Sequence, residues 1–309
     1  MDYVRSKNIQ VKDESDPILG KFLHERNLIK WSSRLKRDKL LKGRKGQFDS
    51  RNVVSSLYRP FTKQFLYFDY IPIDIVGQQR EIFPSLEPGK GNIAIYCTDA
   101  GTQSPFMLIA TNEVPDSHLV GTTAKCLPLY RYDKDGSCID NITDWGLTQF
   151  QTHYNDPTIT KLDIFHYTYS ILHHPVYRIK YELNLKRELP RLPFYADFHQ
   201  WATWGKTLMD LHLNYETIQP YGLERQEIAT KEKPKAKLKA DKTQGVIILD
   251  ENSQLTGIPA IAWDYKLGNR SALEWILDQY KEQYSGQFFE RFCKAFRVCS
   301  SRVELFYQS

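Results

Sequence analysis

The sequence predicts an α+β fold, with a mixed β-sheet region, a following aromatic-rich helical bundle and a small β-hairpin. Between residues 53 and 133, short apolar runs alternate with Gly, Pro, Asp and Asn, which is typical of strands joined by turns. Longer segments between residues 141 and 217 begin at helix-capping residues and are rich in aromatic side chains, which favours packed helices. With 309 residues, 41% of them hydrophobic, the chain can bury a core and form more than one substructure.

The expected strands are the apolar runs at residues 65–68, 93–96, 106–110 and 126–130. A first helix is expected within residues 16–45, where half of the sixteen positions 30–45 are Lys or Arg. Further helices are expected after Asn141, whose Asn-Ile-Thr-Asp segment offers N-cap side chains, and over residues 160–173, 175–189, 196–214 and 270–283. The second and third of these are separated at His174 and Pro175.

The segment at residues 231–242, KEKPKAKLKADK, allows two interpretations, a flexible basic linker or a strand. Its Lys residues alternate with Ala236, Leu238 and Ala240, which is the period of a strand. Residues 241–245 have the composition of a turn before the apolar run at 246–249. We therefore predict a hairpin whose Lys-lined face protects an exposed edge.

Charge is unevenly distributed along the chain. The net charge is +5, but residues 1–63 hold sixteen Lys and Arg against seven Asp and Glu, so this end carries an excess of about nine positive charges. It is a candidate contact for a polyanion, although a solvated helix face would have the same composition. The five cysteines form no CxxC pair, which argues against a disulfide framework or zinc site and favours a reducing cytoplasm. No apolar stretch approaches the ~20 residues of a membrane span.

Several motifs of nucleic-acid enzymes are missing from the sequence. There is no GxxxxGK[ST] or GxGxxG loop for a phosphate, no NPPY-type tetrapeptide for a flipped adenine, and no G-x-S-x-G nucleophile elbow. We therefore expect no bound ATP or S-adenosylmethionine, no cofactor and no catalytic residue. Asp264 and Lys266 have a D-x-K spacing with Asp250 as a possible partner, but a three-residue pattern arises often by chance.

Two histidine patterns could suggest metal ligands. They are the adjacent pair His173 and His174, and Asp210 two residues before His212. Adjacent histidines diverge in a regular backbone and no third ligand is evident, so we expect helix-end and surface residues and no metal site.

Residues 57–69, LYRPFTKQFLYFD, resemble the LYRPF…LYYD signature of Type ISP restriction-modification enzymes and related predicted helicase-methyltransferases. PDSHL at 115–119 is similar to the family's PDLH element and CLPLYRY at 126–132 to its CFPLYRY. Further similar segments are NITDW at 141–145, DIFHY at 163–167, LHHPVYR at 172–178, LKRELPRLPF at 185–194 and YKLGNRSALEW at 265–275. The resemblance covers residues 28–283, in order, and includes only the family's C-terminal target-recognition region.

The resemblance implies sequence-specific binding of double-stranded DNA, with catalysis left to an adenine methyltransferase, a translocase and a nuclease in the same polypeptide or in a separate subunit. It divides the chain into a basic helical segment ending a methyltransferase or connector (1–50), a β-rich part (51–140), a helical part (141–217), a hairpin with a closing helix (218–283) and a divergent tail (284–309). Because the motifs lack the methyltransferase, the chain is interpreted as an excised fragment, a split subunit or a truncated gene.

DNA contacts are predicted at three places. Polar loops at residues 99–104 and 121–125 can reach a DNA groove, and the basic end can meet phosphates. Arg59 and Lys63 in the signature either contact phosphate or fix the fold, for instance through an Arg59–Asp69 ion pair, and Arg131 has the same two interpretations. The predicted DNA-binding residues are Lys36, Arg37, Lys39, Arg59, Lys63, Thr102, Gln103, Ser104, Lys125 and Arg131.

Two other functions compete with DNA recognition. In the first, the aromatic helices at residues 160–214 dock on a methyltransferase subunit. In the second, Asp250 and Asp264 belong to a magnesium-dependent nuclease fragment.

Overall fold

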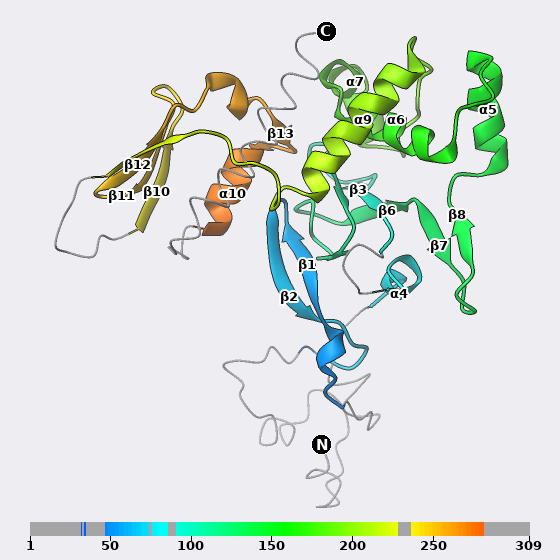
Figure 1. The fold of residues 1–309 in the computed structure, drawn as a ribbon, viewed down its shortest axis with the longest axis horizontal. Coiled ribbons are helices and arrows are strands. Elements are labelled where there is room, and N and C mark those ends of the chain that lie inside the picture. The colour runs from blue at the N-terminus through cyan, green and yellow to red at the C-terminus, as the bar shows by residue number, and fades with distance from the viewer. Residues whose placement is uncertain are drawn as a thin grey trace, which may run out of the picture.

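A computed structural model describes residues 32, 34, 47–73, 76–85, 91–227 and 236–280. Most of the expected basic helix and all of the tail at residues 284–309 lie outside the described residues. The described part is α+β, as predicted, with several small sheets and a helical layer (Figure 1). None of its helices is long and apolar enough to cross a membrane.

The middle layer is an antiparallel sheet of three strands in the order β4-β3-β6. Its strands are β3 (Ala94–Thr98), β4 (Leu108–Thr111) and β6 (Ala124–Pro128), in the order predicted from the apolar runs. Every residue of β3 is buried, because the strand has a packed layer on each face. Ala94 and Tyr96 belong to one hydrophobic cluster, whereas Ile95 and Cys97 belong to the other.

A second small sheet packs on the face of the middle sheet that carries Ala94 and Tyr96. It contains β1 (Val53–Arg59), β2 (Thr62–Tyr67) and β5 (Val114–Pro115) in the order β2-β1-β5, with β1 antiparallel to β2 and parallel to β5. The predicted mixed sheet is therefore divided between two sheets. A two-stranded ribbon of β7 (Tyr130–Tyr132) and β8 (Cys138–Asp140) and a short helix, α4 (Gln79–Ile82), complete this side.

Helices cover the other face of the middle sheet. They are α5 (Asp144–Tyr154), α6 (Lys161–His173), α7 (Pro175–Lys180), α8 (Glu182–Leu185) and α9 (Phe198–Leu213). Pro175 begins α7, as the expected boundary required. The single helix expected over 175–189 is wrong, because the backbone at Tyr181 departs from helical geometry and α8 ends before Pro190.

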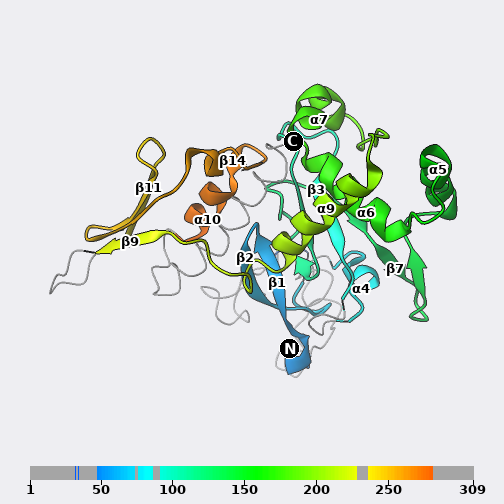
Figure 2. The same ribbon diagram turned by 45° about the horizontal axis from the view of Figure 1, so that its top comes forward.

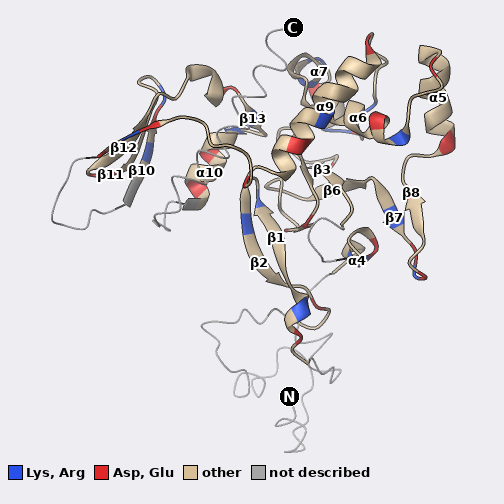
Figure 3. Cartoon of the chain, in the orientation of Figure 1, with Lys and Arg blue, Asp and Glu red and all other residues tan. Residues whose placement is uncertain are grey.

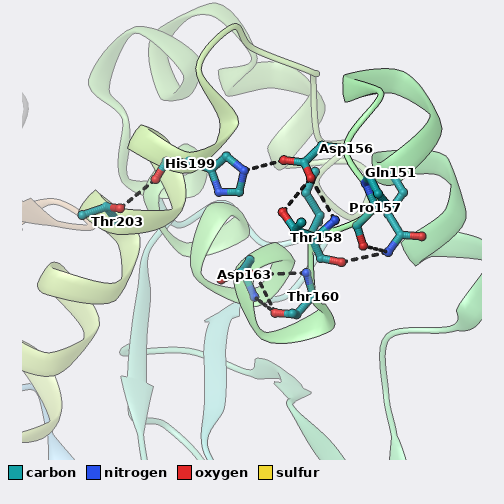
Figure 4. A network of polar contacts seen from close by, with 9 residues as sticks. Gln151, Asp156, Pro157, Thr158, Thr160, Asp163, His199 and Thr203 are labelled. Carbon is teal, nitrogen blue, oxygen red and sulfur yellow. Dashed lines mark hydrogen bonds and ion pairs between the residues drawn. The ribbon is translucent and has the colours of Figure 1, made fainter.

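Polar side chains close the connection between α5 and α6 (Figure 4). The Asp156 carboxylate accepts hydrogen bonds from the backbone and hydroxyl of Thr158 and pairs with the His199 ring at 2.7 Å. Thr160 and Asp163 form a capping box at the start of α6. The helical layer is thus held at its loops as well as through its apolar core.

The C-terminal part stands beside this body in both ribbon views (Figures 1 and 2). The predicted hairpin is present as β10 (Ala236–Asp241) and β11 (Val246–Asp250). It is larger than expected, because β12 (Ser253–Thr256) and β9 (Glu224–Glu227) extend it to four strands. A 3-10 turn (Ala260–Trp263), β13 (Lys266–Leu267) and β14 (Arg270–Ser271) then lead to α10 (Ala272–Tyr280).

A buried polar chain joins the helical layer to the C-terminal part. The Ala110 backbone N–H donates to the Tyr169 hydroxyl, which contacts Nδ1 of His212, and Nε2 of His212 lies 2.7 Å from the Tyr265 hydroxyl. The expectation that the histidines lie at the surface is wrong for His173 and His212, which are both buried. The His173 ring packs against Tyr169 of the same helix, and the His212 ring stacks on Tyr265, 53 residues away.

Candidate nucleic-acid interface

A groove of about 890 Å³ separates the β2-β1-β5 sheet from the edge strand β6 and the β7–β8 ribbon. One wall comes from β1, β2 and β5, and the opposite wall from β6, β7 and β8. Helix α4 and residues 76–78 form a further part of the lining. Segments from residue 56 to residue 141 therefore meet at one surface.

A single buried side chain fixes three segments at this groove. The Asn92 amide donates to the Ile82 and Tyr130 carbonyls, and its oxygen accepts from the backbone N–H groups of Ile93 and Tyr130. Asn92 is only 1% exposed, so water cannot replace these partners. It holds the end of α4, the approach to β3 and the start of β7 in fixed relative positions.

The lining combines amides, cations and carboxylates. Gln64, Gln78, Gln79 and Asn141 supply amide groups, Lys125 and Arg131 the positive charges, and Glu81, Asp116 and Asp133 the negative charges. Amide and guanidinium groups can each form paired hydrogen bonds with the edges of DNA bases, adenine for an amide and guanine for a guanidinium. The groove therefore has side chains suited to base recognition.

Two of the predicted DNA-binding residues lie in this groove. Lys125 is on β6, where its side chain is 51% exposed and its ammonium group lies 3.6 Å from the Asp99 carboxylate. At this separation the pair is a weak surface ion pair, so moving the ammonium group to contact a ligand costs little free energy. Arg131 is exposed on β7.

The two signature cations are not part of the groove lining and are engaged in ion pairs, one of them with the lining residue Asp116. Arg59 pairs with Asp116 at 2.8 Å, and Lys63 contacts Glu113 at 2.9 Å and Glu216 at 3.2 Å. The alternative in which Arg59 pairs with a carboxylate is confirmed, but the partner is Asp116 and not Asp69, which accepts hydrogen bonds from Asn52 and Ile71. A DNA contact by Arg59 or Lys63 stays a prediction.

The two predicted recognition loops lie next to each other. In the register of β3 and β6, Thr98 faces Ala124, and the Asp99 backbone N–H donates to the Thr123 carbonyl. The loop at residues 99–104 is also tied to the end of α8, because the Gly101 N–H donates to the Lys186 carbonyl at 2.7 Å. Its side chains Thr102, Gln103 and Ser104 are outside the groove lining, so their DNA contacts stay predictions.

The remaining predicted contacts, Lys36, Arg37 and Lys39, lie outside the described residues. In the described part, Lys and Arg are interspersed with Asp and Glu (Figure 3). The groove amides, of which Gln64 and Gln78 are exposed, are not among the residues that the sequence predicted. No spacing pattern marks them, because their shared position depends on the pairing of β1 with β2 and on the placement of α4.

The thiols near the groove are held in the neutral form. Burial raises the pKa of Cys126 to about 11 and that of Cys97 to about 12. Burial also raises the pKa of the Tyr96 hydroxyl beside Cys126. Because a thiolate is the reactive form, neither thiol is activated for nucleophilic attack near neutral pH. Among the described residues, no three His, Cys, Asp or Glu side chains are grouped as metal ligands.

The sequence of the chain matches one known family. The family described as the Type ISP C-terminal specificity domain matches residues 2–288. The chain therefore belongs to this family, as the sequence motifs indicated. No curated protein matches the chain.

Solved structures of DNA complexes have the same fold. The DrdV–DNA complex is 34% identical, with a TM-score of 0.84 over 94% of this chain and 31% of that chain. A nuclease-deletion mutant of the Type ISP restriction-modification enzyme LlaGI, in complex with a DNA substrate mimic, is 26% identical, with a TM-score of 0.79 over 99% and 29%. The ATP-dependent enzyme LlaBIII bound to DNA shares the fold at 22% identity and a TM-score of 0.77, over 94% and 21%. The chain spans about a third or less of each.

Proposed function

We propose that this chain recognises a specific sequence in double-stranded DNA as the specificity domain of a restriction-modification enzyme. The groove lined by amides and by Lys125 and Arg131 is the observation that carries the proposal. Family membership and the DNA complexes of its structural relatives support it. Base edges give the sequence choice, while phosphate contacts of the basic N-terminal end supply affinity that depends on salt.

Catalysis belongs, in this proposal, to an adenine methyltransferase and a translocase in the same polypeptide or in a separate subunit. Cys126 lines the groove, and its neutral thiol supplies no activated nucleophile there. The chain should accordingly give no saturable binding of ATP or S-adenosylmethionine in calorimetry. Saturable binding of either would contradict this part of the proposal.

The test is selection from a random duplex library with the full chain, followed by anisotropy titrations of the selected duplex and of random DNA. Replacing Lys125 or Arg131 with Ala should weaken binding of the selected duplex by about 1–3 kcal/mol, because each change removes a base contact. Binding of random DNA should change little. A phosphate contact would instead lower both affinities and reduce the slope of log affinity against log salt by about 0.9.

Two controls define what the result means. Lys206→Ala removes an exposed lysine from α9, outside the groove lining, and should leave the binding of both DNAs unchanged. Gln103→Ala tests the adjacent loop, since a loss of specificity there alone would move the recognition surface from the groove to residues 99–104. If the chain selects no sequence, with or without an added methyltransferase part, the proposed function is wrong.

A further inference from the structure

The β7–β8 ribbon stands apart from the packed body of the described structure. In both ribbon views it projects from the body, with its turn at the free end (Figures 1 and 2). None of residues 130–140 is buried, and all of residues 133–140 are exposed. A two-stranded ribbon without a packed face is marginally stable in water, so contacts at its two ends must hold it.

Polar contacts fix both ends of the ribbon. At its base, the Asn92 side chain bonds backbone groups at the start of β7, and the Lys161 ammonium group lies 2.8 Å from the Asp140 carboxylate. At the turn, the Asp135 carboxylate accepts hydrogen bonds from the backbone N–H and the hydroxyl of Ser137. The ribbon is therefore supported while its strands stay open to solvent.

One face of this ribbon belongs to the groove. Arg131 pairs with Ile139 across the ribbon, so their side chains share a face, and both residues line the groove. Asp133 and Asn141, two positions further along the chain from each, also line the groove. Of the four residues on the opposite face, only Tyr132 does. The strand register and the groove lining thus agree that this face is turned toward the groove.

Two side chains of this face carry opposite charges, at Arg131 and Asp133. Among the described residues, neither the guanidinium nor the carboxylate forms an ion pair or a side-chain hydrogen bond. Exposed charges are common on protein surfaces, but these two stand together in the groove lining. A carboxylate repels phosphates, so the pair is poorly suited to the DNA backbone. It suits base edges, because a guanidinium binds guanine O6 and N7 and a carboxylate accepts a hydrogen bond from cytosine N4.

We propose that the β7–β8 ribbon enters the major groove of the bound duplex, where Arg131 recognises a guanine and Asp133 the amino group of a cytosine. This inference rests on the proposed DNA recognition. The major groove, about 12 Å wide, admits a two-stranded ribbon, whereas the minor groove is only about 6 Å wide. Residues two positions apart on a strand are separated by about 6.6 Å, and base pairs by about 3.4 Å. The two recognised bases should therefore lie within about two base-pair steps of each other.

Selection from random duplexes by the full chain and by three variants tests the ribbon. The unchanged chain should select a site with a fixed guanine and a fixed cytosine close together. Asp133→Ala should lower the preference for that cytosine about tenfold or more and keep the guanine, while Arg131→Ala should do the reverse. Asp264→Ala is the matched control, because it removes an exposed carboxylate outside the groove lining and should leave the selected site unchanged.

Base analogues in the selected duplex report the contacts atom by atom. 7-Deazaguanine lacks the N7 acceptor of the major groove, and N4-methylcytosine replaces the amino hydrogen that a carboxylate would accept there. The first should weaken binding of the unchanged chain several-fold but not that of Arg131→Ala, and the second should do the same for the unchanged chain and Asp133→Ala. Inosine lacks only the minor-groove amino group of guanine and should leave binding unchanged.

The analogue titrations with the unchanged chain decide the question even where a variant is unstable. Sensitivity to inosine together with indifference to 7-deazaguanine would place the contact in the minor groove and overturn the proposal. A site that Arg131→Ala and Asp133→Ala still select in full would also overturn it, as would equal weakening of all duplexes by Arg131→Ala. In each of these cases the recognition function stands, whereas an unchanged chain that selects no sequence would refute that function itself.

Discussion

Replacing Gly205 with Ala should destabilise the helical layer severely. Gly205 lies where α9 crosses α6, and a Cβ atom there would be 1.8 Å from the His166 carbonyl oxygen and 2.6 Å from its carbonyl carbon. Both atoms belong to helix backbone and cannot rotate away. To reach an ordinary contact of about 3.4 Å the helices would have to separate by about 1.6 Å.

The size of the effect follows from two opposing terms. Alanine favours a helix over glycine by about 1 kcal/mol. Against this, overpacking costs about 1–3 kcal/mol or more, and a gap of even 0.5–1 Å between packed atoms forfeits about a quarter to a half of their dispersion attraction. The separation would loosen buried residues along both helices, including Tyr167 and Leu208. We therefore expect a net loss of about 2 kcal/mol in the free energy of unfolding.

Urea unfolding followed by circular dichroism measures this loss, with Gly146→Ala as the matched control. Gly146 is also helical, in α5, but its added Cβ would meet only side-chain atoms at ordinary contact distances, the Thr143 hydroxyl at 3.5 Å and an Ile142 methyl group at 3.8 Å. That variant should gain about 0.4–1 kcal/mol from the lower entropy of its unfolded chain. Equal stability of the two variants would refute the argument that backbone contact between α6 and α9 requires glycine.

Two further predictions concern polar contacts. Asn92→Ala leaves the Ile82 and Tyr130 backbone groups buried without partners, at a cost of about 1–3 kcal/mol each. The variant should therefore lower the free energy of unfolding by about 3 kcal/mol and speed amide exchange at Tyr130. Unchanged exchange at Tyr130 would contradict the role assigned to Asn92. Hydrogen bonds from Thr158 and then from His199 lower the pKa of Asp156 from 3.8 to about 2. Because the folded-state pKa is lowered, this carboxylate stabilises the fold above about pH 4 and its contribution is lost as the pH falls to 2. Asp156→Asn should remove that part of the acid dependence, and an NMR titration of Asp156 near 3.8 would refute the assignment.

The sequence determined those features of this protein that depend on neighbouring residues. The apolar runs that form β3, β4 and β6, the break at Pro175 and the hairpin of β10 and β11 follow from local patterns. The motifs between residues 28 and 283 indicated the family, because unrelated chains do not share so many motifs in the same order along the sequence. The sequence also indicated Lys125 and Arg131 as candidate DNA contacts, and both residues line the groove.

Only the tertiary structure decided which distant residues meet. Arg59 pairs with Asp116, 57 positions away, and not with the nearby Asp69, because parallel pairing brings β5 alongside β1. His212 lies buried between Tyr169 and Tyr265. Its helix, α9, packs against α6, which carries Tyr169, and its ring also reaches Tyr265, just before β13. The groove amides come together in the same way, because their shared position depends on how separate sheets are placed, and no local periodicity encodes that placement.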